Sequence, residues 1–205
     1  MHSIRSELYA LAAGLFKAPR KGRDQAIYSL ATDILQSDIA EAPWRAPLKA
    51  IARDLSEKRH PQHLLAAEYA RLFTFPTPQS TVSPFASDWL QDRGKSAMEV
   101  ESLMGCQGFA AGTDSPQAPD HIVAELEFMA HLIQTSPRGA QRIFLSHLAT
   151  WTSCFALAIR QAKSLPRFEL AADFLEKLVN WDLRRLTSNP PQRTQTAVQT
   201  DRVLT

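Results

Sequence analysis

Hydrophobic residues recur along this chain at the three- and four-residue spacings of amphipathic helices. The first such stretch begins after Ser3 and stops before Pro19, with one apolar residue on the same face at every turn. Similar stretches follow along the rest of the sequence. The predicted helices begin after Ser3, at Asp24, near Trp44, after Pro61, at Ser96, at Asp120, near Phe144 and near Ala171.

This periodicity, together with only seven glycines in 205 residues, predicts an all-α fold. We expect a single-domain helical bundle of about eight or more helices over residues 1–186. Two long loops rich in proline or glycine interrupt it at 75–86 and 108–119. Loops of that length in a compact domain are often functional. A polar stretch with two consecutive prolines predicts a flexible C-terminal tail at 187–205.

Composition excludes several classes of function. A net charge of +2 is too small to indicate nucleic acid or an acidic membrane as the main partner. Cys106 and Cys154 form no C-x-x-C pair and predict no disulfide framework. The N-terminal residues do not resemble a secretory signal, and no run of 18 apolar residues predicts a membrane span. The expected location is the cytoplasm.

Motifs for catalysis are weak, so we expect no enzyme activity. Gly94-Lys95-Ser96 matches half of a phosphate-binding loop, but Trp89 stands where the earlier glycine is required. Ser96 and Glu99 fit a helix capping box better. Glu57 and His60 form a lone E-x-x-H, which is half of a di-iron motif, so no metal site is predicted.

The stretch from Pro119 to Met129 is unusual, because two acids stand among residues that favour burial. Asp120 is expected to cap the helix that follows. Glu125 lies one turn after His121, so these two side chains can hydrogen-bond within the helix. Glu127 and His131 have the same spacing and are expected to form a structural pair.

This stretch resembles the PDHI-x-x-E-L-x-F-M segment of the TorD/DmsD family, the cytoplasmic chaperones of exported molybdoenzymes. A second similarity covers 68–73, which reads E-Y-A-R-L-F, continues through Pro76 and ends in P-F-A-S at 84–87. A third, more general similarity is the helix at 144–155. Phe75 replaces the usual glycine before Pro76, and the 84–87 motif lacks its usual acid.

The resemblance implies a redox-enzyme maturation chaperone that binds the twin-arginine signal peptide of a molybdopterin oxidoreductase precursor. Such a protein assists cofactor insertion and prevents premature export. The signal peptide would be bound by an apolar groove with acids at one end, and the enzyme body would be a further partner. The expected peptide-binding residues are Tyr69, Leu72, Phe73, Phe85, Trp89, Asp120, His121 and Glu125. The expected structural residues of the motifs are Glu68, Pro76, Pro84, Ser87, Pro119, Glu127 and Trp151.

Three alternatives stay open at the level of sequence. The client of the chaperone could be a molybdoenzyme that is never exported. A nucleotide-binding or nucleotide-hydrolysing protein would use Lys95 and the loop at 108–119. A helical scaffold subunit would have no peptide groove. No cofactor is expected, although the resemblance leaves room for weak contact with a nucleotide or with molybdopterin. A monomer and a helix-exchanged homodimer are both compatible with the long loops.

Overall fold

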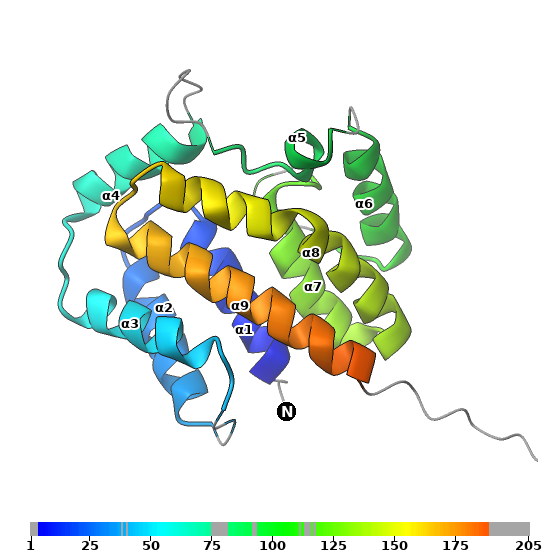
Figure 1. Ribbon diagram of the computed structural model, residues 1–205, viewed down its shortest axis with the longest axis horizontal. Helices are drawn as coiled ribbons and strands as arrows, with labels where there is room; N and C mark the ends of the chain where they lie inside the picture. The colour runs from blue at the N-terminus through cyan, green and yellow to red at the C-terminus, as the bar shows by residue number, and fades with distance from the viewer. Residues whose placement is uncertain are drawn as a thin grey trace, which may run out of the picture.

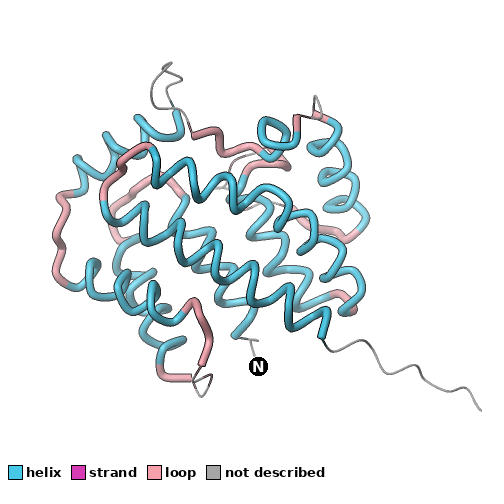
Figure 2. The backbone as a smooth tube through the Cα atoms, viewed as in Figure 1, coloured by secondary structure: helices cyan, strands magenta, loops and turns pink. Residues whose placement is uncertain are grey.

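The chain folds into α-helices (Figures 1 and 2), and the apolar stripes of the sequence form their buried faces. The structure is a computed structural model that describes residues 4–37, 39, 41–74, 82–91, 94–110, 112, 116 and 118–188. The helices are α1 (Ile4–Phe16), α2 (Arg23–Leu35), α3 (Arg45–Ser56), α4 (Gln62–Tyr69), α5 (Ala86–Leu90), α6 (Lys95–Cys106), α7 (Ile122–Thr135), α8 (Arg138–Gln161) and α9 (Pro166–Ser188). A π-helical turn, Ala70–Thr74, extends α4. This confirms the predicted all-α bundle.

The two longest helices, α8 and α9, pack along each other as an antiparallel pair (Figure 1). Helix α1 packs between α7 and α9, while α2 and α3 cover the other side of α1 and α9. The short α5 connects to α6 and rests on α8. Figure 1 shows α4 and α6 on opposite sides of the molecule, with α8 between them.

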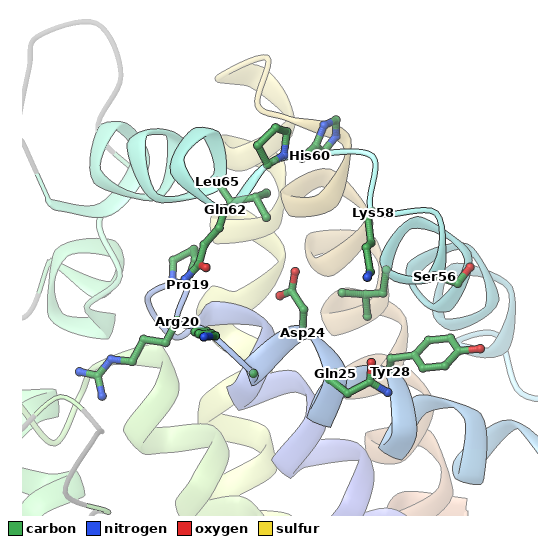
Figure 3. A pocket seen from close by; sticks show the side chains of 14 residues that line it. Pro19, Arg20, Asp24, Gln25, Tyr28, Ser56, Lys58, His60, Gln62 and Leu65 are labelled. Atoms are coloured by element: carbon green, nitrogen blue, oxygen red, sulfur yellow. The ribbon is translucent and has the colours of Figure 1, made fainter.

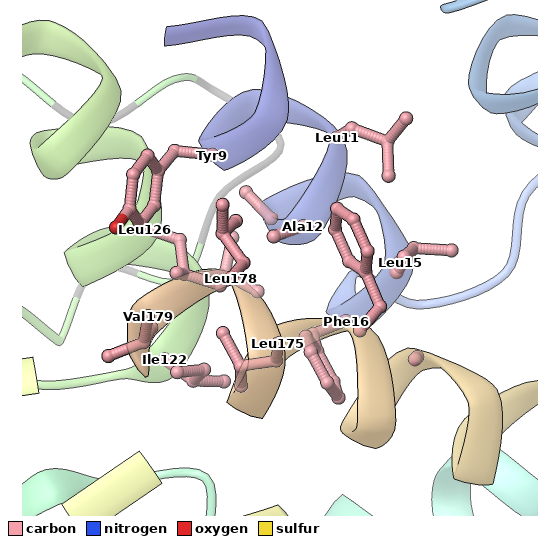
Figure 4. Packing of buried hydrophobic residues seen from close by; sticks show 14 of the residues in the cluster. Tyr9, Leu11, Ala12, Leu15, Phe16, Ile122, Leu126, Leu175, Leu178 and Val179 are labelled. Atoms are coloured by element: carbon pink, nitrogen blue, oxygen red, sulfur yellow. The ribbon is translucent and has the colours of Figure 1, made fainter. Parts of the chain in front are cut away.

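The core lies where α1, α7 and α9 meet (Figure 4). Phe16 of α1 lies beside Leu175 of α9, and Leu126 of α7 lies beside Leu178 of α9. All four side chains are almost completely buried. Burial of one such side chain contributes about 1.5–3 kcal/mol, so this cluster holds together helices distant in sequence.

Two networks of buried ion pairs reinforce this core. The Nε of Arg5 in α1 donates to Asp182 of α9 at 2.8 Å, and the hydroxyl of Tyr9 donates to the same carboxylate at 3.1 Å. Burial raises the pKa of Tyr9 well above its usual value. The second network joins Arg167 of α9 to Asp54 of α3 at 2.5 Å and to Asp24 of α2 at 2.8 Å. Each network therefore ties α9 to the N-terminal helices.

The predicted helix caps are wrong in detail. The N-cap residue of α2 is Gly22, whose φ of 84° is easily adopted by glycine, and Asp24 pairs with Arg167 instead. Helix α6 begins at Lys95 after Gly94, so Ser96 lies inside the first turn and the capping box does not form there. The first two residues of the predicted tail, 187 and 188, belong to α9, and 189–205 lie outside the described residues.

One helix of the described chain, α8, is long and apolar enough to cross a membrane by length and composition alone. Core helices of ordinary globular proteins meet the same criterion. Its apolar residues Phe144, Leu148 and Phe155 are buried within the bundle, against α7 and α9. The composition of α8 is therefore accounted for by its place in the core.

Candidate functional site

Two of the sequence motifs meet at one place, which we call the α5–α7 junction and define as residues 83–90 and 118–125. An antiparallel bridge pairs Phe85 with His121. The amide of Ala86 donates to the carbonyl oxygen of Asp120 at 2.9 Å, and the amide of Ile122 donates to that of Pro84 at 2.8 Å. The backbone thus fixes the starts of α5 and α7 side by side.

Asp120 caps α5 rather than α7, which corrects the prediction. Its Oδ2 accepts from the hydroxyl of Ser87 at 2.7 Å and from the amide of Ser87 at 3.3 Å. Both recorded hydrogen bonds therefore end on one oxygen of a carboxylate that is 4% exposed. The described residues place no arginine or lysine in an ion pair with Asp120.

His121 is the residue that caps α7. Its Nδ1 accepts from the amide of Val123 at 3.1 Å, which requires that nitrogen to be unprotonated. The ring lies edge-on to Phe85, with centroids 5.3 Å apart. Burial lowers the pKa of His121 to about 4, while the nearby charge of Asp120 opposes the shift. His121 is therefore uncharged at neutral pH, and its ring packs against an aromatic side chain.

Glu125 lies beneath the junction and is completely buried. It does not pair with His121 as predicted, because its Oε1 is 2.8 Å from Nε2 of His147 and its Oε2 accepts from the indole of Trp151 at 3.1 Å. Burial raises the pKa of Glu125, while the contacts with His147 and Trp151 oppose the shift. The predicted direct contact of Glu125 with a peptide is inconsistent with its zero exposure. Its place is that of a brace between α7 and α8.

The predicted apolar wall residues gather around one side chain of α8, Phe155. The ring of Phe73 stacks on it at 6.1 Å, and the ring of Trp89 lies edge-on to it at 6.3 Å. Tyr69 packs edge-on against Phe73 at 5.1 Å. These three predicted residues are half-buried, whereas Leu72 is fully buried and belongs to the core, which removes it as a direct contact.

The remaining motif residues hold this arrangement in place. Glu68 pairs with Arg71 at 2.7 Å and accepts from the amide of Leu165 at 3.0 Å, so it anchors the α8–α9 connection. The indole of Trp89 donates to the carbonyl oxygen of Ser83 at 2.8 Å. Pro119 precedes the bridge, and Pro76 lies outside the described residues.

A further predicted pair has different partners. Glu127 forms an ion pair with Lys17 at 2.7 Å, and Nε2 of His131 is 3.2 Å from the carbonyl oxygen of Gln107. Glu127 and His131, one turn apart on α7, therefore bind partners on other elements.

Two residues of α8 that contact the site residues, His147 and Phe155, were not predicted from the sequence. The signal was present, since both lie four residues from Trp151 on the same helix.

The junction offers carboxylate, aromatic rings and backbone ends, but no catalytic array. No group of three or more His, Cys, Asp or Glu side chains suited to a metal ion occurs within the described ranges. Such a surface is suited to binding an extended or helical segment with basic and apolar side chains. The chemistry of the junction therefore favours recognition of a protein segment over catalysis.

Comparisons with known proteins agree with this conclusion. The fold is similar to the crystal structure of a candidate redox enzyme maturation protein from Archaeoglobus fulgidus, with a TM-score of 0.64 and 22% identity. The match covers 88% of this chain and 96% of the other. The chain belongs to the nitrate reductase delta subunit family, whose sequence model matches residues 38–156, more than half of the protein.

Two similar proteins both carry the name chaperone protein TorD. The chaperone protein TorD of Shewanella pealeana is 24% identical over 203 residues, which cover 90% of each chain. TorD of Vibrio cholerae is 26% identical over 192 residues, covering 84% of this chain and 87% of its own. The resemblance to the TorD/DmsD family is confirmed. The protein is a TorD-like member of this family.

Proposed function

We propose that this chaperone binds the twin-arginine signal peptide of a molybdopterin oxidoreductase precursor in the cytoplasm. Binding holds the precursor back from export while its cofactor is inserted, and contacts with the enzyme body add to the affinity. The chain itself acts by binding and carries out no catalytic step. The proposal deepens the family assignment by naming the client segment and the surface that receives it.

The observation that carries the proposal is the state of Asp120. Its recorded hydrogen bonds come from one neutral residue and occupy only Oδ2. A guanidinium group presents donors in a planar fork that matches a carboxylate, and such charge-assisted bonds are stronger than neutral ones. An incoming arginine can therefore supply the cation that the described part of the chain does not give to Asp120.

The apolar part of a signal peptide has a matching surface nearby. Phe85 and His121 form one edge of the junction, and Trp89, Phe73 and Tyr69 form an aromatic row against Phe155. Aromatic side chains contribute large contact areas at low cost in conformational entropy. His121, neutral near pH 7, adds no positive charge that would repel the arginines.

Glu125 supports the site from inside rather than contacting the peptide. Its bonds to His147 and Trp151 fix α8, which carries Phe155, relative to the start of α7. A brace of this kind holds Asp120 and the aromatic row at a constant separation. The role of Glu125 is therefore one of positioning.

The expected affinity follows from opposing terms. Burying four apolar peptide side chains contributes roughly 6–12 kcal/mol. Ordering a flexible peptide costs about 2–5 kcal/mol, and the loss of rigid-body freedom costs more. Since a micromolar dissociation constant corresponds to about 8 kcal/mol, we expect binding near micromolar. That affinity suits a chaperone that must release its client.

Calorimetric titration with a synthetic twin-arginine signal peptide tests the proposal. The wild-type protein is compared with Asp120→Asn, and the peptide with a version in which both arginines are lysines. Asp173→Asn, on an exposed part of α9, is the matched control. We expect saturable binding that weakens about tenfold with either change and not with the control. Absence of binding to signal peptides of several molybdoenzymes would overturn the proposal in favour of a scaffold role.

A further inference from the structure

The α5–α7 junction is acidic, although the chain as a whole carries a net charge of +2. Its residues include three acids, Asp88, Asp120 and Glu125, and neither arginine nor lysine. The imidazole of His121 is uncharged at neutral pH, because burial lowers its pKa to about 4. A cation for these acids therefore has to come from another element of the fold or from another molecule.

Basic side chains gather at a different surface of the bundle. Arg20, Lys21 and Lys58 line a cavity of about 670 Å³ at the α1–α2 and α3–α4 connections (Figure 3). Figure 3 shows Lys58 extending toward the space above Asp24, whereas Arg20 lies at the rim and points outward. No residue of the junction lines this cavity. The positive charge of this surface is therefore separate from the acids of the junction.

Asp88 is the exposed acid of the junction. It follows Ser87 in α5, and the hydroxyl of Ser87 donates to Asp120 at 2.7 Å. The hydroxyl of Ser83 donates to the carboxylate of Asp88 and accepts from the amide of Phe85 at 3.3 Å. These bonds hold Asp88 at the start of α5, and the described residues give its carboxylate a neutral donor and no ion pair.

The three acids of the junction differ in what they offer to a ligand. Glu125 is completely buried, and His147 and Trp151 engage both of its carboxylate oxygens. Asp120 is 4% exposed, and its recorded hydrogen bonds end on Oδ2 alone. The bond that Asp88 accepts also ends on its Oδ2. Two carboxylates, one deep in the junction and one at its surface, therefore each keep an oxygen for an incoming donor.

From this arrangement we infer that Asp88 binds one arginine of the twin-arginine pair while Asp120 binds the other. The inference rests on the proposed function and assigns a second acid to the same site. Successive side chains of an extended segment point to opposite sides, so two adjacent arginines do not enter one buried carboxylate together. One guanidinium reaches Asp120, and its neighbour stays at the surface, where Asp88 presents a carboxylate beside Ser87.

The depth of the two carboxylates predicts effects of different size. An exposed ion pair contributes less to binding than a buried one, and salt screens it. Asp88→Asn should therefore weaken peptide binding about threefold at low salt, and this effect should vanish near about 0.5 M sodium chloride. The asparagine keeps an acceptor for the hydroxyl of Ser83, so the thermal midpoint should stay unchanged. Asp33→Asn, at an exposed position of α2, makes the same change in charge and serves as the control.

Calorimetric titration of the full-length protein tests the inference, with a synthetic twin-arginine signal peptide and two versions in which one arginine is glutamine. We expect the effect of Asp88→Asn to disappear with one version and that of Asp120→Asn to disappear with the other.

The outcomes separate this inference from the proposed function. Wild-type binding that Asp88→Asn leaves unchanged, or that Asp33→Asn weakens equally, would overturn the role of Asp88 and leave the proposed function standing. Effects of Asp88→Asn and Asp120→Asn that both depend on the same arginine would do so as well. Absence of binding by the wild-type protein would overturn the proposed function, and the role of Asp88 with it.

Discussion

Buried carboxylates in two regions of this protein have different partners. In the contacts that α9 makes with the N-terminal helices, Asp182 of α9 and Asp54 of α3 each bind an arginine, at 2.8 and 2.5 Å. At the α5–α7 junction, Asp120 is held by a serine, and Glu125 by an indole and an imidazole. All four residues are almost completely buried. Both regions thus hold carboxylates away from water, but one uses arginine and the other uses hydroxyl, indole and imidazole groups.

The difference shows which region is complete by itself. Arg5 and Asp182 neutralise each other inside the protein, and Arg167 supplies a cation to Asp54 that it shares with the half-exposed Asp24. At the junction, by contrast, the recorded partners of Asp120 are the hydroxyl and amide of Ser87, so no cation of the described residues binds this carboxylate. The pairs along α9 therefore serve the fold, and the junction is suited to receive a basic group from another molecule.

The largest effect is expected where an ion pair is broken. Arg167→Ala leaves Asp54 buried without its cation and should destabilise the protein by about 3–5 kcal/mol. The measurement is urea unfolding at neutral pH. Arg53→Ala removes an exposed pair with Glu57 and serves as the control, with an unchanged midpoint. Equal effects of the two substitutions would contradict the structural role of the pair along α9.

The second prediction concerns acid sensitivity at the junction. The pKa of His121 is lowered to about 4 in the folded protein and is about 6.5 in the unfolded chain, so the unfolded chain binds the extra proton first. Stability therefore falls as the pH falls from about 6.5 toward 4. At pH 4.5 the loss should be about 2–3 kcal/mol, and His121→Asn, which retains a capping side chain, should remove it.

Glu125 acts in the opposite sense over part of this range. Its raised pKa means that the folded protein keeps a proton that the unfolded chain has lost, so its contribution to stability increases as the pH falls. Urea unfolding of wild type and His121→Asn at several pH values separates the two residues. If the two proteins lost the same stability between pH 6.5 and 4.5, His121 would not be the sensitive group.

The third prediction removes a neutral donor from the junction. Trp151→Phe keeps an aromatic ring in the core but deletes the indole N–H that donates to Glu125 at 3.1 Å. A buried acceptor that loses its donor costs about 1–3 kcal/mol, which chemical unfolding can measure. Trp181→Phe, a half-buried indole on α9, is the control for the loss of a tryptophan. A stability equal to that of the control would show that Glu125 does not depend on this bond.

The smallest effect is expected for the cap of α5. Ser87→Ala removes the hydroxyl that donates to Asp120 at 2.7 Å and should cost about 1 kcal/mol of stability. Because the carboxylate is then less occupied, affinity for an arginine-containing peptide should be kept or increased. Thermal unfolding and calorimetry on the same sample measure both. A strong loss of peptide affinity would indicate that Ser87 itself contacts the peptide.

Local patterns predicted the helices well, because each apolar stripe needs only its own sequence to be recognised. The stretch from Ile4 to Phe16 and the helix after Pro61 lie where the spacing placed them. The caps were less predictable, since Asp120 is the residue type preferred at N-caps, yet its neighbour His121 caps α7. The bridge to Phe85 decided between them by directing Asp120 toward α5.

The partners of the site residues could not be predicted from local spacing. Glu125 lies one turn from His121 in sequence, yet it binds Trp151 and His147 of another helix. The pairing of Arg167 with Asp54 spans 113 residues and has no local signature. The motif residues that meet at the junction were visible in the sequence, while their contacts depend on how α7, α8 and α9 pack.

The central claim is that Asp120 receives an arginine of the client peptide, and a double-mutant cycle tests it most directly. Calorimetry would measure the affinities of wild type and Asp120→Asn for the twin-arginine peptide and for peptides with either arginine changed to glutamine. We predict a coupling of at least about 1 kcal/mol between Asp120 and one arginine. Additive losses, with no coupling to either arginine, would contradict the account.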